Sequence, residues 1–117
     1  MDANEIREYC LALRGVTESF PFDKETLVFK IGGKMFLLLA LEKQPIVFSA
    51  KCNPETAMQL REKFSQISGA YHMNKTHWNN VVCDGLKKDF IQNLINDSYL
   101  LVYQSLTKKI KFEIENG

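Results

Sequence analysis

The chain has 117 residues, a length that fits one domain with a buried core. Its apolar content of 45% and charged content of 25% are ordinary for a globular protein, and no apolar run is long enough to span a bilayer. The net charge of +1 lacks the clear basic excess that dedicated nucleic-acid-binding domains usually carry. We therefore expect a single domain over residues 1–117 that makes no use of a membrane.

The N-terminus and the cysteines predict a cytoplasmic protein. The first five residues, MDANE, contain no basic segment leading into an apolar core, so no signal peptide is expected. Three cysteines at wide spacing, Cys10, Cys52 and Cys83, favour free thiols in a reducing compartment over a disulfide framework.

The first predicted element is an amphipathic helix over residues 3–14. Asp2 and Glu5 have the spacing of a capping box, and Gly15 suits the left-handed residue that ends a helix. The apolar side chains that recur at the spacing of one helical face are Ile6, Tyr9, Cys10 and Leu13.

The next segment predicts a β-hairpin followed by a third strand. Two extended apolar runs, residues 26–31 and 34–41, flank Gly32 and Gly33. Because both glycines can adopt positive φ, they suit a tight two-residue turn. Residues 46–51 form the third predicted strand.

A two-residue turn also predicts the register of this hairpin. It places Ile31 opposite Lys34, Phe29 opposite Phe36, and Leu27 opposite Leu38, on a face that we expect to be the core. The side chains predicted on the other face are Thr26, Val28, Lys30, Met35, Leu37 and Leu39. That face is more apolar than a solvated sheet face should be, so it is covered within the domain or meets a partner.

The second half of the chain predicts two helices and a strand. Asn53 is a good N-cap and Pro54 suits the first turn of a helix that ends at Ser68-Gly69. Its apolar face comprises Ala57, Leu60, Phe64 and Ile67. Residues 78–83 predict a strand and residues 86–106 a long amphipathic helix. Residues 108–111 are a basic tail segment, after which we expect the chain end to be mobile.

The predicted order of elements is helix, three strands, helix, strand, helix. Strands joined by hairpins, with helices separated from them in sequence, are typical of the α+β class. We expect a two-layer sandwich in which a mostly antiparallel sheet carries its helices on one face.

One string is specific enough to suggest a family: His72-Met73-Asn74-Lys75-Thr76-His77-Trp78. Further matching segments are Arg7–Leu11, Gly15–Glu18, Phe20–Phe22, Gly33–Phe36, Lys51–Glu55, Ser98-Tyr99 and Leu101-Val102. With these residues the chain resembles the MmcQ/YjbR family of small bacterial proteins along nearly its full length. Where this chain has Leu13-Arg14-Gly15 the family tends to have Leu-Pro-Gly, a departure that affects one turn.

The resemblance implies a fold similar to that of frataxin (CyaY-like), in agreement with the order of elements. It also implies DNA binding through loops described as a double wing. The candidate contacts to double-stranded DNA are Lys34, Lys51, His72, Asn74, Lys75, His77, Trp78 and Asn79. Lysines suit phosphates, amides suit base edges, and an indole offers a stacking surface. A structural role is the alternative for Trp78 as a core residue and for Asn74 and Asn79 as turn residues.

Catalysis and metal binding are not expected. The chain has no glycine-rich phosphate loop and no pair of carboxylates suited to acid–base chemistry, so we predict a non-catalytic protein without a cofactor. His72 and His77 are five residues apart, a spacing that points them to opposite faces of a strand, and we assign no metal site to them.

A second hypothesis needs no nucleic acid. The apolar sheet face with Met35, Leu37 and Leu39 suits a protein-interaction or small-ligand-binding module, with homodimerisation as one form of it. Titration with duplex DNA separates the two hypotheses.

Overall fold

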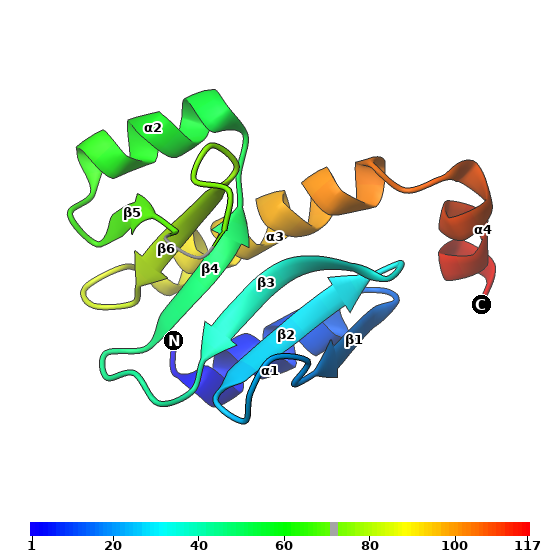
Figure 1. Ribbon diagram of the computed structural model, residues 1–117, viewed down its shortest axis with the longest axis horizontal. Coiled ribbons are helices and arrows are strands. Elements are labelled where there is room, and N and C mark those ends of the chain that lie inside the picture. Colours follow the sequence, from blue (N-terminus) through cyan, green and yellow to red (C-terminus); the bar gives the residue numbers. More distant parts are fainter. Residues whose placement is uncertain (71–72) are drawn as a thin grey trace.

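A computed structural model describes residues 1–70 and 73–117, which form an α+β fold with one antiparallel sheet (Figure 1). The elements are α1 (Ala3–Ala12), β1 (Val16–Ser19), β2 (Thr26–Ile31), β3 (Lys34–Ala40), β4 (Val47–Lys51), α2 (Pro54–Lys63), β5 (Ile67–Gly69), β6 (Trp78–Val82), α3 (Lys88–Gln104) and α4 (Lys108–Asn116). The strands lie in the order β1-β2-β3-β4-β6-β5, and every neighbouring pair is antiparallel. The predicted fold class is confirmed.

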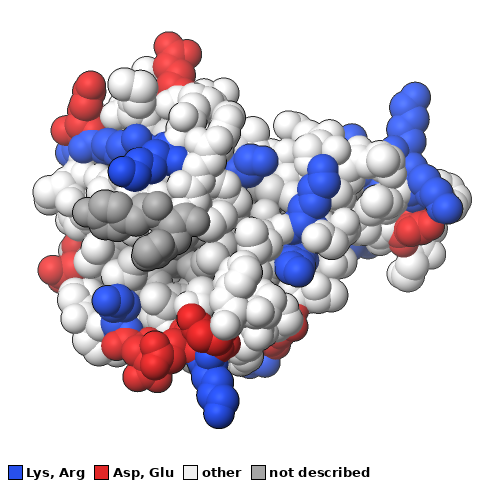
Figure 2. Space-filling model, viewed as in Figure 1, with Lys and Arg blue, Asp and Glu red and all other residues white. Residues whose placement is uncertain are grey.

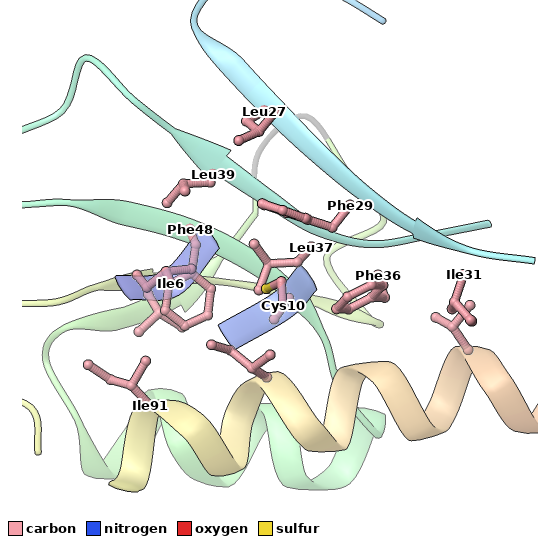
Figure 3. Packing of buried hydrophobic residues seen from close by; sticks show 14 of the residues in the cluster. Ile6, Cys10, Leu27, Phe29, Ile31, Phe36, Leu37, Leu39, Phe48 and Ile91 are labelled. Atoms are coloured by element: carbon pink, nitrogen blue, oxygen red, sulfur yellow. The ribbon is translucent and has the colours of Figure 1, made fainter. Parts of the chain in front are cut away.

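The helices cover one face of the sheet, which makes the fold a two-layer sandwich. In Figure 1 the open face of the sheet is toward the viewer, and α1 and α3 lie behind it. Figure 3 shows Phe29 and Leu37 on the strands pointing toward Ile6 and Cys10 on α1 and toward Ile91 on α3. These five side chains are fully buried, so the core lies between the sheet and the two helices.

Local sequence signals account for several element boundaries. Asp2 and Glu5 form the predicted capping box, with reciprocal side-chain to backbone hydrogen bonds. The Asn53 side chain caps α2, and Pro54 is its first residue. Gly32 and Gly33 both adopt positive φ, at 58° and 81°, in the turn between β2 and β3.

The register of the β2–β3 hairpin differs from the prediction after its first pair. Ile31 pairs with Lys34 as expected, but Phe29 pairs with Leu37 and Leu27 pairs with Leu39, because a β-bulge shifts the register between Phe29 and Lys30. A shift of one residue moves each following side chain to the opposite face. The prediction that Leu37 and Leu39 lie on the outer face is therefore wrong: both are fully buried in the core.

The second helix is shorter than predicted. It ends at Lys63, and Phe64 has extended backbone angles. Ile67 lies in β5, where it pairs with Val81, and not on the helix. Ile67 is buried in the sheet, so its apolar side chain fits a strand position as well as the predicted helical one.

Two further elements were not predicted. β1 is an edge strand that pairs with β2. The chain end, expected to be mobile, forms α4, whose first turn is capped by the Thr107 side chain. Ile110 and Ile114 pack against the core cluster, and Arg14 donates a hydrogen bond to the carbonyl oxygen of Glu115 at 2.8 Å. These tertiary contacts hold the helix in place.

None of the helices within residues 1–70 and 73–117 is long and apolar enough to cross a membrane.

Candidate nucleic-acid interface

Antiparallel pairing brings several strand termini to one end of the sheet. β2 ends there with Lys30 near its terminus, β3 begins there with Lys34, and β4 ends there with Lys51. β6 begins there as well, because Trp78 pairs with Lys51, and Lys75 precedes Trp78 by three residues. We call the region of Lys30, Lys34, Lys51 and Lys75 the lysine end.

The opposite end of the sheet carries most of the acidic residues of the strand connections. Those residues are Asp23, Glu25, Glu42 and Asp84, with Lys24 and Lys43 among them. In Figure 2 blue atoms are spread across the upper part of this face from the α2 side to α4, with some red atoms above them and near α4, and the largest group of red atoms lies along the lower edge beside further blue atoms. Two acids, Glu55 on α2 and Asp97 on α3, lie near the lysine end. The acidic residues of the strand connections are therefore mostly at the end opposite the lysine end.

The lysines of this end differ in their surroundings. Lys34 is exposed, and its Nζ lies 3.4 Å from the hydroxyl of Ser105. Lys30 and Lys51 are half-buried, and Lys75 is exposed. The salt bridges formed within the described part of the chain join Arg7 to Glu18 and Lys88 to Glu5, so none uses Lys30, Lys34 or Lys51.

The segment before β6 is a turn that its own polar groups stabilise. The Asn74 side-chain oxygen accepts a hydrogen bond from the backbone N–H of Thr76 at 2.9 Å. The Asn74 carbonyl oxygen accepts from the N–H groups of His77 and Trp78 at 3.0 and 2.9 Å. Asn74 therefore has the turn-forming role that the structural alternative gave it.

Arg61 on α2 attaches this turn to the helix layer. Its guanidinium donates to the side-chain oxygen of Asn79 at 2.7 Å, to the carbonyl oxygen of Trp78 at 3.3 Å, and to that of Lys75. Gly69 lies directly against the guanidinium, where an added Cβ would be 3.3 Å from Arg61 Cζ. Arg61 thus positions the backbone of Lys75. No pattern in the sequence indicates this role, because an arginine on a helix is ordinarily solvated.

Two of the predicted contact residues are buried. Trp78 is 8% exposed and Asn79 is 3% exposed. The Asn79 amide is already engaged, since it accepts from Arg61 and donates to the carbonyl oxygen of Ala57 at 3.4 Å. We therefore withdraw Trp78 as a stacking surface and Asn79 as a reader of base edges.

The two histidines add little to the site. His77 is half-buried, and its carbonyl oxygen accepts a hydrogen bond from the N–H of Cys52 at 2.7 Å. His72 lies outside the described residues. Within residues 1–70 and 73–117, no group of three His, Cys, Asp or Glu side chains is placed to hold a metal ion.

Ser98 on α3 positions Lys51 and was missed from the sequence. Its side chain is fully buried, and its hydroxyl donates to the carbonyl oxygen of Phe36 and accepts from the N–H of Lys51 at 2.8 Å. The hydroxyl thus joins β3 to β4 just beyond their last paired residues, Leu37 and Ala50. Its only sequence signal is a polar residue in the apolar stripe of a helix.

The cysteine thiols are not activated. Burial raises the pKa of Cys10 to about 12 and that of Cys83 to about 11. Burial and the nearby Asp97 carboxylate also raise the pKa of Cys52. All three thiols are free and stay protonated at neutral pH, which disfavours nucleophilic chemistry at these residues.

A family model and curated relatives identify the family of this chain. Residues 11–101 match the model of the YjbR family. One curated relative is YbdF of Escherichia coli O157:H7, which is 32% identical to this chain over the full length of both proteins. Another is YjbR of E. coli K12, which is 34% identical over 85% of each protein. Both relatives are called uncharacterised. The crystal structure of Deinococcus radiodurans protein DR2400 matches 96% of this chain and 86% of its own, with a TM-score of 0.90 at 36% identity. A crystal structure from Pseudomonas syringae matches 87% of this chain and 99% of its own, with a TM-score of 0.75 at 28% identity.

Proposed function

The chain belongs to the YjbR family, and we propose that it is a non-catalytic member whose partner is double-stranded DNA. The observation that carries the proposal is the convergence of Lys34, Lys51 and Lys75 at one end of the sheet, away from the acidic end. A cluster of cations suits the phosphate backbone, which dominates protein–DNA affinity. The proposal includes a cytoplasmic location, because that compartment holds the DNA of a bacterial cell.

The buried positions of Trp78 and Asn79 determine what kind of DNA binding the site supports. Both residues would have contacted bases, and neither is available. Asn74 uses its side-chain oxygen within its own turn. Lysine contacts to phosphates carry no sequence information. We therefore propose binding that does not depend on base sequence.

The expected salt dependence follows from the number of phosphate contacts. Three lysine–phosphate contacts contribute about −2.7 to the slope of log K against log salt concentration. Between 50 and 200 mM salt that contribution lowers affinity about 40-fold.

The test is a titration of a fluorescent 20-base-pair duplex, followed by anisotropy at 50 and 200 mM salt. Lys34→Ala/Lys75→Ala is compared with Lys24→Ala/Lys43→Ala, which removes the same charge from the opposite end of the sheet. We expect the first variant to reduce the salt slope by about 1.8 and the second to leave it unchanged. Absence of wild-type binding at 50 mM salt, or equal losses in both variants, would overturn the proposal.

The interaction-module hypothesis lost its strongest support. Of the three side chains that suggested it, Leu37 and Leu39 are fully buried beneath the helices, and only Met35, which pairs with Lys30 and is outside the core cluster, lies on the open face. Among the described residues, the exposed large apolar side chains Phe20 and Phe22 share the β1–β2 connection, whereas Met58, Leu100 and Phe112 lie on α2, α3 and α4. Scattered exposed apolar residues are ordinary on protein surfaces, so we retain DNA as the proposed partner.

A further inference from the structure

The tip of the β2–β3 hairpin and the start of α4 lie against each other. A Cβ added to Gly32 would lie 2.7 Å from Leu106 Cδ1 and 2.9 Å from Ile110 Cγ2, so the glycine backbone is in direct contact with this segment. Lys34 reaches the same segment, with its Nζ 3.4 Å from the Ser105 hydroxyl. The first turn of α4 is therefore adjacent to the lysine end.

That first turn adds two exposed cations. Ile110 and Ile114 are the half-buried residues that pack against the core cluster, and Lys108 and Lys109 are exposed. Neither lysine forms a salt bridge within the part of the chain that the structure describes. Lys108 and Lys109 thus directly precede Ile110, whose side chain contacts the hairpin turn that carries Lys34.

Lys111 on the same helix is held differently. It is half-buried, and its Nζ lies 5.7 Å from the centre of the Tyr103 ring on α3. A cation over an aromatic face is already partly satisfied. Lys111 therefore serves as an internal control, because it has the same charge on the same helix in a different setting.

We infer that Lys108 and Lys109 extend the lysine end into a longer strip of phosphate contacts, so that a bound duplex touches α4 as well as the sheet. The inference rests on the proposed function. α4 lies beyond residues 11–101, so this part of the strip is outside the segment that matches the family model.

The shape of the molecule sets the length of DNA that such a strip can contact. The longest Cα dimension is 40 Å, and α4 lies at one end of that axis (Figure 1). One base pair occupies 3.4 Å of the duplex axis, so a duplex along this axis meets the protein over at most about 12 base pairs. A 20-base-pair duplex therefore covers the whole strip.

The test compares Lys108→Ala/Lys109→Ala with Lys111→Ala in the same anisotropy titration. With five lysine–phosphate contacts in place of three, the slope of log K against log salt concentration is about −4.5. The double variant should reduce the magnitude of this slope by about 1.8. The ratio of wild-type to variant affinity then changes about 12-fold between 50 and 200 mM salt. Lys111→Ala should change the slope by less than 0.5, on the order of half a phosphate contact.

The outcomes separate this inference from the proposed function. Wild-type binding with an unchanged slope in the double variant overturns the α4 contact alone, whereas absence of wild-type binding overturns both. An effect of Lys111→Ala as large as that of one of the other lysines would show a general charge effect and overturn the α4 contact. Lys108→Gln/Lys109→Gln, with helix content checked by circular dichroism, confirms that any loss of affinity comes from charge and not from unfolding of α4.

Discussion

Ser98→Ala should destabilise the protein more than its size suggests. The substitution removes one hydroxyl from a fully buried side chain and deprives two backbone groups of a partner, the Phe36 carbonyl and the Lys51 N–H. Each buried polar group left unsatisfied costs about 1–3 kcal/mol. Because water that enters the site would recover part of that cost, we expect a loss of about 2–4 kcal/mol.

The measurement is urea unfolding of the wild type and of Ser98→Ala. The midpoint should fall without a change in the m-value, since the surface exposed on unfolding is nearly the same. Ser49→Ala is the control: its hydroxyl donates to the Asn80 side chain at 2.5 Å, but both residues are half-buried on the open face, where water can replace the bond. We expect the control to lose less than about 1 kcal/mol. A loss below about 0.5 kcal/mol for Ser98→Ala would refute the role of its hydroxyl in joining β3 and β4.

Two further predictions concern the hairpin turn and the buried thiol. Gly32→Ala should lower the free energy of unfolding by about 2–5 kcal/mol, because it adds a clash with Leu106 and Ile110 to the strain of positive φ. Gly33→Ala should lower it by only about 1–2 kcal/mol, because no atom lies within 4 Å of the added Cβ. Thermal unfolding compares the two variants, and equal losses would contradict the close contact with α4. Stability should also fall as the pH rises above about 8.5, because the Cys10 thiol ionises in the unfolded chain while its pKa in the folded protein is about 12. At pH 10 the loss of folding free energy from Cys10 is about 2 kcal/mol. Urea unfolding at pH 7 and pH 10 should therefore show a smaller loss of stability in Cys10→Ala than in the wild type.

Features set by local chemistry were predictable from the sequence. The Asp2–Glu5 capping box, the Asn53-Pro54 helix start and the Gly32-Gly33 turn each depend on a few neighbouring residues. Periodicity also located the long helix α3, because its apolar stripe continues for four turns or more.

Features set by distant contacts were not predictable in the same way. The β-bulge that sends Leu37 and Leu39 into the core has no local signal, since a run of apolar residues fits either register. α4 did carry a weak signal, in which Thr107 precedes Ile110 and Ile114 at helical spacing, but its stability depends on contacts with Gly15 and Gly32 far back in the chain. The likeness to the frataxin fold stays a prediction.

For the site, the sequence identified residue types and not their orientations. Lys34, Lys51 and Lys75 were predicted, and antiparallel pairing brings them to one end. The burial of Trp78 and Asn79 was left open, because an indole or an amide has the same sequence signature in a binding surface and in a core. Their burial changes the expected recognition from base contacts to phosphate contacts.

The net charge of +1 is compatible with the proposed DNA binding because most acidic residues of the strand connections lie away from the lysine end. β3 has seven residues, so the lysine end and the acidic end lie about 23 Å apart along the strands. The Debye length is about 8 Å at physiological ionic strength, which makes that separation nearly three screening lengths. Under the proposed function, a duplex at the lysine end would be attracted by the nearby lysines, would be repelled locally by Glu55 and Asp97, and would feel little repulsion from the acids at the other end. What governs the interaction is the local charge within one screening length of the phosphates, and the total charge of the chain is a poor guide to it.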